Sequence, residues 1–224
     1  MRLAIADPPY LGRANRWYGT GRGHRGGVGR AATHEAAAEW DYPATHVALI
    51  ERLEAEYDGW AIAASADPAS TRVYEAALPD GARRCVWVKG NAIPSGSRVS
   101  GKWEPVYVKI PEGRSAHRTG AAVNDVLIAG ISYRHNYVGS KPYPWTHWVL
   151  DMLGYQPDDE LHDLFAGSGA VALATELHTP APEVSCAFCG APIEQPLSGR
   201  PRRTCSPVCR QRLARRTRAL QMHR

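Results

Sequence analysis

Short apolar runs bounded by turn-forming residues predict the β-strands of this chain. Residues 1–7 (MRLAIAD) place four apolar residues in a row and end at two prolines, as a short buried strand does. Residues 84–89 and 105–110 alternate between apolar and polar side chains, which is the period of a strand. The predicted strands are residues 1–7, 60–65, 84–89, 105–110 and 161–165, with one more short strand at 126–129.

A spacing of three and four residues predicts the helices. In the best-marked segment, a glycine stop signal at Gly154 follows five apolar residues at helical spacing. These residues are Trp145, Trp148, Val149, Met152 and Leu153. The predicted helices are residues 43–57, 145–153 and 170–177.

Residues 11–34 carry neither pattern. This segment holds seven glycines and five arginines and has no acidic residue. Because such a composition offers no apolar face to a core, the segment is predicted to be a mobile loop without helix or strand.

The positive charge lies in the C-terminal part of the chain. The 224 residues have a formal net charge of +5, but residues 183–224 alone contain nine arginines and two acids. Arginine presents a planar fork of donors to phosphate, so this part suits a polyanion. No run of 18 apolar residues occurs, and the first ten residues do not resemble a signal peptide, so a cytoplasmic protein without a membrane span is expected.

The turn Asp7-Pro8-Pro9-Tyr10 is the first segment with candidate chemistry. Two prolines remove two backbone donors and stop a helix or a sheet ladder, so carbonyl oxygens stay free beside the Asp7 carboxylate. A carbonyl and a carboxylate can accept hydrogen bonds from an NH₂ group, and the Tyr10 ring can stack on a planar base. The alternative is a plain turn in which Asp7 caps a local N–H group.

The second such segment is residues 163–169 (DLFAGSG), a predicted strand, turn and helix start. Gly167 and Gly169 let the backbone turn sharply and approach a ligand closely. The helix start offers N–H donors to an anionic group. The segment is neither a Walker loop nor a complete G-x-G-x-x-G signature, and glycine turns between a strand and a helix are also common without a ligand.

Together, the DPPY turn and the F-x-G-x-G turn resemble the amino-methyltransferases of DNA, which use S-adenosylmethionine. The catalytic turn comes first here, which resembles the permuted, β-type order of many bacterial and phage members. Lys141-Pro142 before a predicted helix and the segments VWVKGNAIPSG and KWEPVYV also resemble this family. The resemblance covers residues 1–178 and implies an α/β fold, a Rossmann-like methyltransferase sheet with helices on both faces.

This resemblance implies roles for the residues of both turns. Asp7 and the Pro8 carbonyl would accept hydrogen bonds from the two N–H groups of an exocyclic amine. Pro9 and Tyr10 would complete the catalytic turn, and Tyr10 would stack on a base flipped out of double-stranded DNA. Adenine is expected because the turn begins with Asp, whereas cytosine members more often begin with Ser. The residues implied to hold the cofactor are Asp163, Phe165, Gly167, Ser168, Gly169, Lys141 and Pro142. A solvated lysine at a helix start is the alternative for Lys141.

One feature of the family is missing. Members with a full sheet follow the cofactor helix with a strand that ends in an acid and binds the ribose hydroxyls. Here a linker, residues 179–185, begins almost at once, so the sheet is expected to be truncated. No long target-recognition insert is visible either, and the candidate DNA contacts are instead loop arginines, with a disordered loop as the alternative. These are Arg13, Arg16, Arg22 and Arg25.

Four of the five cysteines have the spacing Cys186-x2-Cys189-x15-Cys205-x3-Cys209, which matches a tetrahedral four-thiolate zinc site. The two knuckles resemble small zinc-ribbon or treble-clef modules. Residues 186–224 are too few to build a core alone, so metal binding would drive their folding. Their candidate DNA contacts, for which a solvated surface is the alternative, are Arg202, Arg203, Arg210 and Arg212. The fifth cysteine, Cys85, is predicted to be a buried core thiol.

The sequence therefore predicts a methyltransferase domain, residues 1–178, joined to a zinc-binding basic module, residues 186–224. The expected function is that of a site-specific adenine methyltransferase of DNA from a bacterium or phage, as in restriction–modification. The alternatives are a cytosine amino-methyltransferase, an RNA or protein amide methyltransferase, and a non-catalytic zinc-dependent nucleic-acid-binding protein with a degenerate methyltransferase fold.

Overall fold

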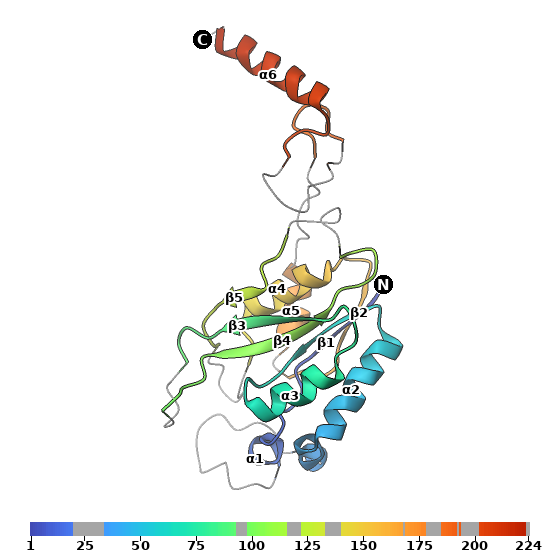
Figure 1. The fold of residues 1–224 in the computed structure, drawn as a ribbon, viewed down its shortest axis with the longest axis vertical. Coiled ribbons are helices and arrows are strands. Elements are labelled where there is room, and N and C mark those ends of the chain that lie inside the picture. Colours follow the sequence, from blue (N-terminus) through green and yellow to red (C-terminus); the bar gives the residue numbers. More distant parts are fainter. Residues whose placement is uncertain are drawn as a thin grey trace. The chain divides into compact units, whose positions relative to one another are not determined.

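Two compact units make up the chain, Met1–Glu112 with Asn124–His178 and Gly113–Val123 with Thr179–Arg224. The computed structural model describes residues 1–19, 34–92, 98–115, 122–132, 140–167, 169–177, 185–191, 193 and 202–222. The first unit contains a β-sheet and its covering helices, and the second contains the four clustered cysteines and one further helix (Figure 1).

Six strands form one mixed sheet in the first unit (Figure 1). They are β1 (Arg2–Ala6), β2 (Gly59–Ala63), β3 (Arg83–Val88), β4 (Trp103–Lys109), β5 (Val126–Ile128) and β6 (Glu160–Asp163). Their order across the sheet is β5-β3-β4-β2-β1-β6, and β4 alone runs antiparallel to its neighbours. All six predicted strands are confirmed, with ends shifted by at most two residues.

Three helices of the first unit follow the predicted ranges. They are α2 (Pro43–Glu56), α4 (Tyr143–Leu153) and α5 (Ala170–Leu177). Gly154 ends α4 with a φ of 62°, the left-handed conformation that favours glycine, so the predicted stop signal is confirmed. Together with the sheet, these helices confirm the predicted α/β fold.

Helix α3 (Pro68–Ala77) and the 3₁₀ helix η1 (Glu35–Asp41) were not predicted. Helix α3 begins after Asp67, whose carboxylate accepts hydrogen bonds from the backbone N–H groups of Ala69 and Ser70. Its buried side chains are Ser70 and Tyr74. Because both are polar, the apolar spacing that marks the other helices is absent here.

The prediction of a loop without helix over residues 11–34 was wrong for its first part. Helix α1 (Ala14–Tyr18) forms there, and Ala14 is fully buried. The Asp41 carboxylate accepts hydrogen bonds from the N–H groups of Ala14 and Asn15, at 2.8 and 3.1 Å. An acid distant in the sequence thus caps this helix, which the composition of the segment itself does not reveal. Residues 20–33 lie outside the described residues.

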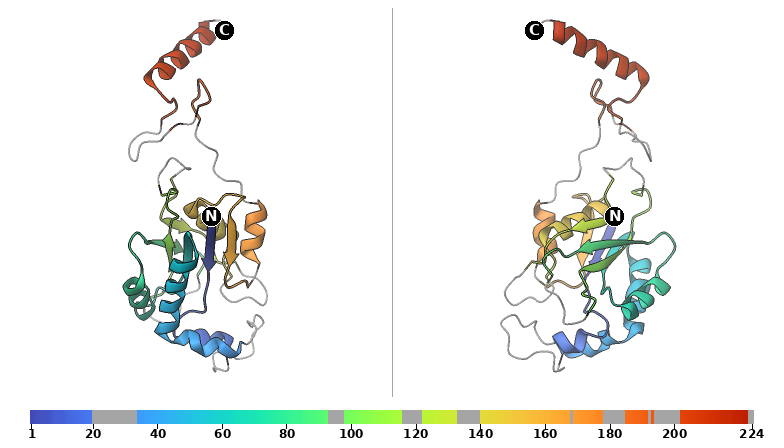
Figure 2. Two further views of the ribbon diagram at one scale, coloured as in Figure 1. Left: turned by 90° about the vertical axis from the view of Figure 1, so that its right-hand side faces the viewer. Right: turned by 60° about the vertical axis from the view of Figure 1, so that its left-hand side comes forward.

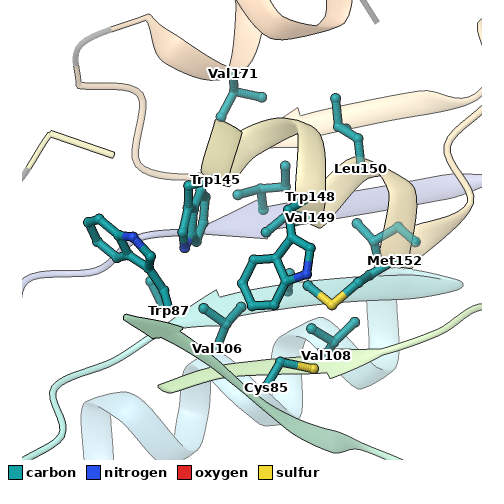
Figure 3. Close-up of a cluster of buried hydrophobic side chains, with 14 of the residues drawn as sticks. Cys85, Trp87, Val106, Val108, Trp145, Trp148, Val149, Leu150, Met152 and Val171 are labelled. Carbon is teal, nitrogen blue, oxygen red and sulfur yellow. The ribbon is translucent and has the colours of Figure 1, made fainter. Parts of the chain in front are cut away.

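Side chains alternate between the two faces of the sheet and form two cores. Leu3, Ile5, Val106 and Val108 face helices α4 and α5, where Figure 3 shows Trp145, Trp148 and Met152 over the strands. The opposite face packs against α2 and α3, so helices cover both faces of the sheet (Figure 2). The side chains of this second core include Ala4, Ala6, Leu49, Ile50, Leu53, Trp60, Ile62 and Tyr74. Cys85 is 4% exposed within the first core, which confirms its prediction.

Strand β6 lies at one edge of the described sheet and pairs only with β1. Within the described part of the chain, the sheet has no strand beyond β6. Within those same described residues, no helix has both the length and the apolar composition needed to cross a membrane.

Candidate functional site

The two chemistry-bearing turns come together at one edge of the sheet. Strands β1 and β6 are parallel neighbours, with Ile5 opposite Asp163, and the Leu164 N–H group donates to the Ile5 carbonyl at 3.0 Å. Because both strands point the same way, the turns that follow them leave the sheet on the same side, where ligands of open α/β sheets bind. Burial is the largest influence on the pKa of Asp163 and raises it, and the Asp7 charge raises it further.

Five polar side chains form what we call the charge cluster behind the DPPY turn. They are Asp7, Tyr10, Lys89, Glu104 and Lys141. Lys141 Nζ donates to Asp7 Oδ1 at 2.7 Å and to the Tyr10 hydroxyl at 3.1 Å. The Tyr10 hydroxyl in turn donates to Glu104 Oε2 at 2.6 Å. The Lys141 side chain is 7% exposed and that of Asp7 is 33% exposed, so the lysine is buried and Asp7 is half-buried.

Lys89 and Glu104 were not predicted to belong to the site. Lys89 follows β3 and Glu104 lies in β4, and the Lys89 ammonium donates to Glu104 Oε1 at 2.7 Å. Both side chains are at least four-fifths buried. The available signal was a charged residue beside the apolar run of each strand. The sequence does not specify which face of the sheet such a residue lies on or which side chain it contacts.

Aromatic rings surround the Lys141 ammonium group. Its Nζ atom lies 5.3 Å from the centre of the Tyr10 ring, 5.8 Å from that of Trp87 and 5.7 Å from that of Trp145. Both tryptophans are almost fully buried. Ring faces attract cations, so these rings favour a charged Lys141 in a position where water is scarce.

The electrostatic balance differs between the two carboxylates. Burial is the largest influence on the pKa of Asp7 and raises it, and although the Lys141 ammonium partly offsets this, the pKa stays above its ordinary value. Burial also opposes the charge of Glu104, but Lys141 and Lys89 outweigh it and lower the pKa of Glu104. Burial alone would lower the pKa of Lys141, but Asp7 and Glu104 together raise it. The surroundings therefore disfavour the charge of Asp7 and favour the charge of Glu104.

The remaining residues of the DPPY turn lie beside this cluster. Pro8 is buried and Pro9 is half-buried. Within the described part of the chain, no N–H or O–H group donates to the Pro8 carbonyl. Lys141, which the resemblance assigns to the cofactor side, contacts Asp7 and Tyr10 here, and the buried Pro142 precedes helix α4.

The glycine turn after β6 leaves its backbone open. The Phe165 N–H group donates to Asp163 Oδ1 at 3.3 Å, which starts the turn. A Cβ atom at Gly167 would have its nearest neighbour at 3.8 Å, and Gly169 has a φ of +70° with nothing within 4 Å of a Cβ position. Ser168 lies outside the described residues. The backbone here is therefore accessible to a ligand that needs close approach.

An apolar pocket of about 230 Å³ opens beside this turn. Its walls come from η1, helix α2 and the end of β6, and the rings of Trp40 and Phe165 meet edge to face with centres 5.0 Å apart. The lining residues are Trp40, Thr45, Ala48, Leu49, Arg52, Leu164 and Phe165. This volume is below the range of about 300–1,000 Å³ typical of pockets for drug-sized ligands, so it suits a single ring system.

The second unit brings the four cysteines of the predicted zinc site together. Their sulfur atoms all lie within 4.8 Å of one another, and the Cys189–Cys205, Cys205–Cys209 and Cys189–Cys209 pairs are 3.6, 3.5 and 3.8 Å apart. Sulfurs about 2.3 Å from a tetrahedral zinc would be separated by about 3.8 Å. The donor set therefore fits a zinc ion.

Local hydrogen bonds shape the loops that hold these sulfurs. The Cys186 N–H group donates to the Ala191 carbonyl at 2.7 Å, and Gly190 between them adopts a φ of +74°. The Ala187 N–H group donates to the Arg203 carbonyl at 3.0 Å and ties the two halves of the site. Cys209 lies in the first turn of helix α6 (Pro207–Met222).

The predicted DNA contacts lie partly within the described residues. Arg13 and Arg16 are exposed at helix α1, whereas Arg22 and Arg25 lie outside the described residues. Around the cysteines, all four predicted arginines are exposed, and they are Arg202, Arg203, Arg210 and Arg212.

Comparison with known proteins finds similarity to solved structures only. No protein-family model and no curated protein matches this chain. A solved complex of M1.HpyAVI with SAM is 14% identical, with a TM-score of 0.47 over 79% of this chain and 77% of that chain. A crystal structure of M1.HpyAVI is 15% identical, with a TM-score of 0.46 over 78% of this chain and 75% of that chain.

Proposed function

We propose that this protein transfers a methyl group from S-adenosylmethionine to the exocyclic amino group of a base in DNA, with adenine as the base. The observation that supports this most is the position of two turns on neighbouring parallel strands, the DPPY turn after β1 and the glycine turn after β6. The hydrogen-bond acceptors of the DPPY turn and the accessible backbone of the glycine turn would then face the same space. Such an arrangement suits a reaction between two bound partners.

The DPPY turn supplies what an amino group needs in order to react. An exocyclic amine is a weak nucleophile because its lone pair is delocalised into the ring. The Asp7 carboxylate and the Pro8 carbonyl would accept hydrogen bonds from its two N–H groups and direct the lone pair away from the ring. These hydrogen bonds would be strongest as positive charge develops on nitrogen. Tyr10 lies beside them and would stack on the flipped base.

S-adenosylmethionine, when bound, supplies a methyl carbon made electrophilic by a sulfonium group. The nitrogen would bond to this carbon, and the carbon–sulfur bond would break with its electron pair left on sulfur. The amine gives up one proton in this exchange. We assign the uptake of that proton to Asp7, whose raised pKa makes it a better proton acceptor than an ordinary carboxylate.

The glycine turn and the apolar pocket would hold the cofactor. Gly167 and Gly169 allow close approach of the methionine part, and Asp163 offers a carboxylate to its ammonium group. The adjacent pocket is of a size for one ring system and has two aromatic walls, Trp40 and Phe165. We therefore assign the adenine ring of the cofactor to this pocket.

Trp40→Ala is expected to raise the Kd for S-adenosylmethionine about tenfold, because it removes one aromatic wall of the pocket, and a tenfold change corresponds to about 1.4 kcal/mol. Isothermal calorimetry measures this directly. Tyr42→Ala is the matched control, since Tyr42 is a nearby aromatic residue that is 65% exposed and does not line the pocket. An unchanged Kd in a folded Trp40→Ala protein would place the adenine ring elsewhere.

Residues 186–224, which we call the cysteine module, would bind one zinc ion and contact the DNA backbone. Its four sulfurs lie within 4.8 Å of one another, as the four ligands of a tetrahedral zinc ion do, and its exposed arginines suit phosphate groups. We propose the exposed Arg13 and Arg16 as further phosphate contacts, together with Arg22 and Arg25, which lie outside the described residues.

Nucleoside mass spectrometry of DNA from cells that express the protein tests the proposed reaction. We expect N6-methyladenine above the background of cells that carry an empty vector. Methylcytosine in its place would correct the base. No methylated nucleoside, together with no binding of S-adenosylmethionine in calorimetry, would contradict the proposed function.

A second candidate function is that of a non-catalytic, zinc-dependent DNA-binding protein. The edge position of β6 favours it, because the described sheet contains no further strand whose acid would bind the cofactor ribose. DNA binding that persists without any calorimetric response to S-adenosylmethionine would support this alternative.

A further inference from the structure

The Lys141 ammonium group is shared unequally between two carboxylates. Its Nζ atom lies 2.7 Å from Asp7 Oδ1 and 3.8 Å from Glu104 Oε2. In this arrangement one Asp7 oxygen already accepts a strong hydrogen bond from a cation. An amino group that binds to that oxygen has to compete with Lys141.

We propose that Glu104 is a positioning residue that takes the Lys141 ammonium group away from Asp7 when the substrate amine binds. Asp7 Oδ1 then becomes available to the amine, while Lys141 keeps a carboxylate partner in the buried cluster. This inference rests on the proposed function, because the amine that displaces Lys141 is the methyl acceptor.

The geometry of Glu104 suits this role. The Tyr10 hydroxyl donates to Oε2 and the Lys89 ammonium donates to Oε1, so both oxygens are held in place. Oε2, the oxygen nearer to Lys141, has one neutral donor and keeps capacity for a second. A movement of about 1 Å brings Nζ to the distance of about 2.8 Å that is usual for charged hydrogen bonds, and a four-carbon lysine side chain has the freedom to make it.

The charges of the cluster also favour such a transfer. Glu104 is 14% exposed and carries its negative charge between two lysines. The Trp87 and Trp145 rings contact the Lys141 ammonium group and offer it no hydrogen bond, and the Tyr10 hydroxyl that accepts one from it is neutral. Without the Glu104 charge, Asp7 would be the one carboxylate left for Lys141 within the cluster, and Lys141 would stay on it.

Steady-state kinetics of E104Q and K141M, alone and combined, test this role. E104Q is expected to lower kcat about a hundredfold, because the amine is displaced from its productive position, with the Kd for S-adenosylmethionine changed less than about threefold. If Glu104 acts through Lys141, adding E104Q to K141M lowers kcat by less than about threefold further. Independent, multiplicative effects of the two substitutions, or an unchanged kcat in E104Q, would overturn the proposal.

Two further variants guard against a purely structural effect. E104D keeps the negative charge but withdraws it by one methylene group, so we expect it to fold like the wild type and to lose kcat as E104Q does. Glu54→Gln is the matched control, since Glu54 pairs with Lys109 at 3.4 Å outside the site and its neutralisation is expected to leave kcat unchanged. Wild-type kcat in a folded E104D protein would contradict the need for contact between Glu104 and Lys141.

An NMR titration of Asp7 separates this inference from the proposed function. The titratable groups that act on Asp7 or respond to it are Tyr10, Tyr18, Tyr74, Glu104, Lys141 and Asp163. Because the Glu104 charge raises the pKa of Asp7 and Lys141 lowers it, E104Q is expected to lower this pKa and K141M to raise it. A wild-type protein without activity would contradict the proposed function alone, whereas an unchanged pKa of Asp7 in E104Q would overturn the coupling itself.

Discussion

Asp7→Ala is expected to lower the rate of DNA methylation by about 10² to 10³-fold and to leave S-adenosylmethionine bound with nearly unchanged affinity. The substitution removes one of the two acceptors that the DPPY turn offers to the amino group. Because these acceptors matter most as charge develops on nitrogen, the loss falls on kcat rather than on cofactor binding. Mass spectrometry of nucleosides measures the first quantity and calorimetry the second.

Two variants make this experiment selective. Asp7→Asn keeps an oxygen that accepts a hydrogen bond, so it is expected to retain more activity than Asp7→Ala. Asp80→Ala removes an exposed carboxylate that belongs to neither turn nor to the charge cluster, and this variant is expected to methylate DNA like the wild type. Because the Lys141 ammonium loses a partner in Asp7→Ala, thermal unfolding establishes that each variant is folded. Equal methylation by Asp7→Ala and wild type would remove Asp7 from the mechanism.

Cys205→Ser is expected to reduce the zinc content from about one ion per chain to nearly none and to unfold the cysteine module. Structural zinc contributes about 10–16 kcal/mol of apparent binding free energy in small domains, and this module has little core to replace it. DNA binding should then weaken. Its salt dependence should become shallower by about three to four units of slope, because four exposed arginines no longer meet phosphates together.

Cys85→Ser is the matched control for that variant. Cys85 is the fifth cysteine and lies buried in β3, in the sheet-containing unit. Its substitution is expected to leave zinc content and the salt slope unchanged. Elemental analysis and binding titrations at several salt concentrations measure both. Wild-type DNA binding by a zinc-free Cys205→Ser protein would confine the module to a structural role.

The elements that could be predicted are those in which apolar side chains recur at the period of a helix or a strand. Helix α4 places Trp145, Trp148 and Val149 on a single face and ends at a glycine, so its pattern and its end were both visible. Helices α1 and α3 were not predicted because neither is marked by apolar side chains at helical spacing. Asp41 caps α1 from another segment, and α3 buries Ser70 and Tyr74 rather than aliphatic residues.

The candidate site divides in the same way. Asp7 and Tyr10 were recognised because their turn has a distinctive local sequence, and the roles assigned to them stay predictions. Glu104 and Lys89 were missed because they sit in ordinary strand segments. Their importance depends on the pairing of β3 with β4 and on the arrival of Lys141 from a distant part of the chain.

The sequence by itself determined where the six strands and helices α2, α4 and α5 form, where two prolines and two glycines make the turns after β1 and β6, and which four cysteines share a metal-like spacing. Each of these depends on residues close together in the chain. Only the tertiary structure decided that β1 and β6 are neighbours, that Lys141 lies between Asp7 and Glu104, and that a pocket opens beside Phe165. Strand order and register arise from burial on both faces of the sheet at once, and that condition joins segments that no local pattern connects.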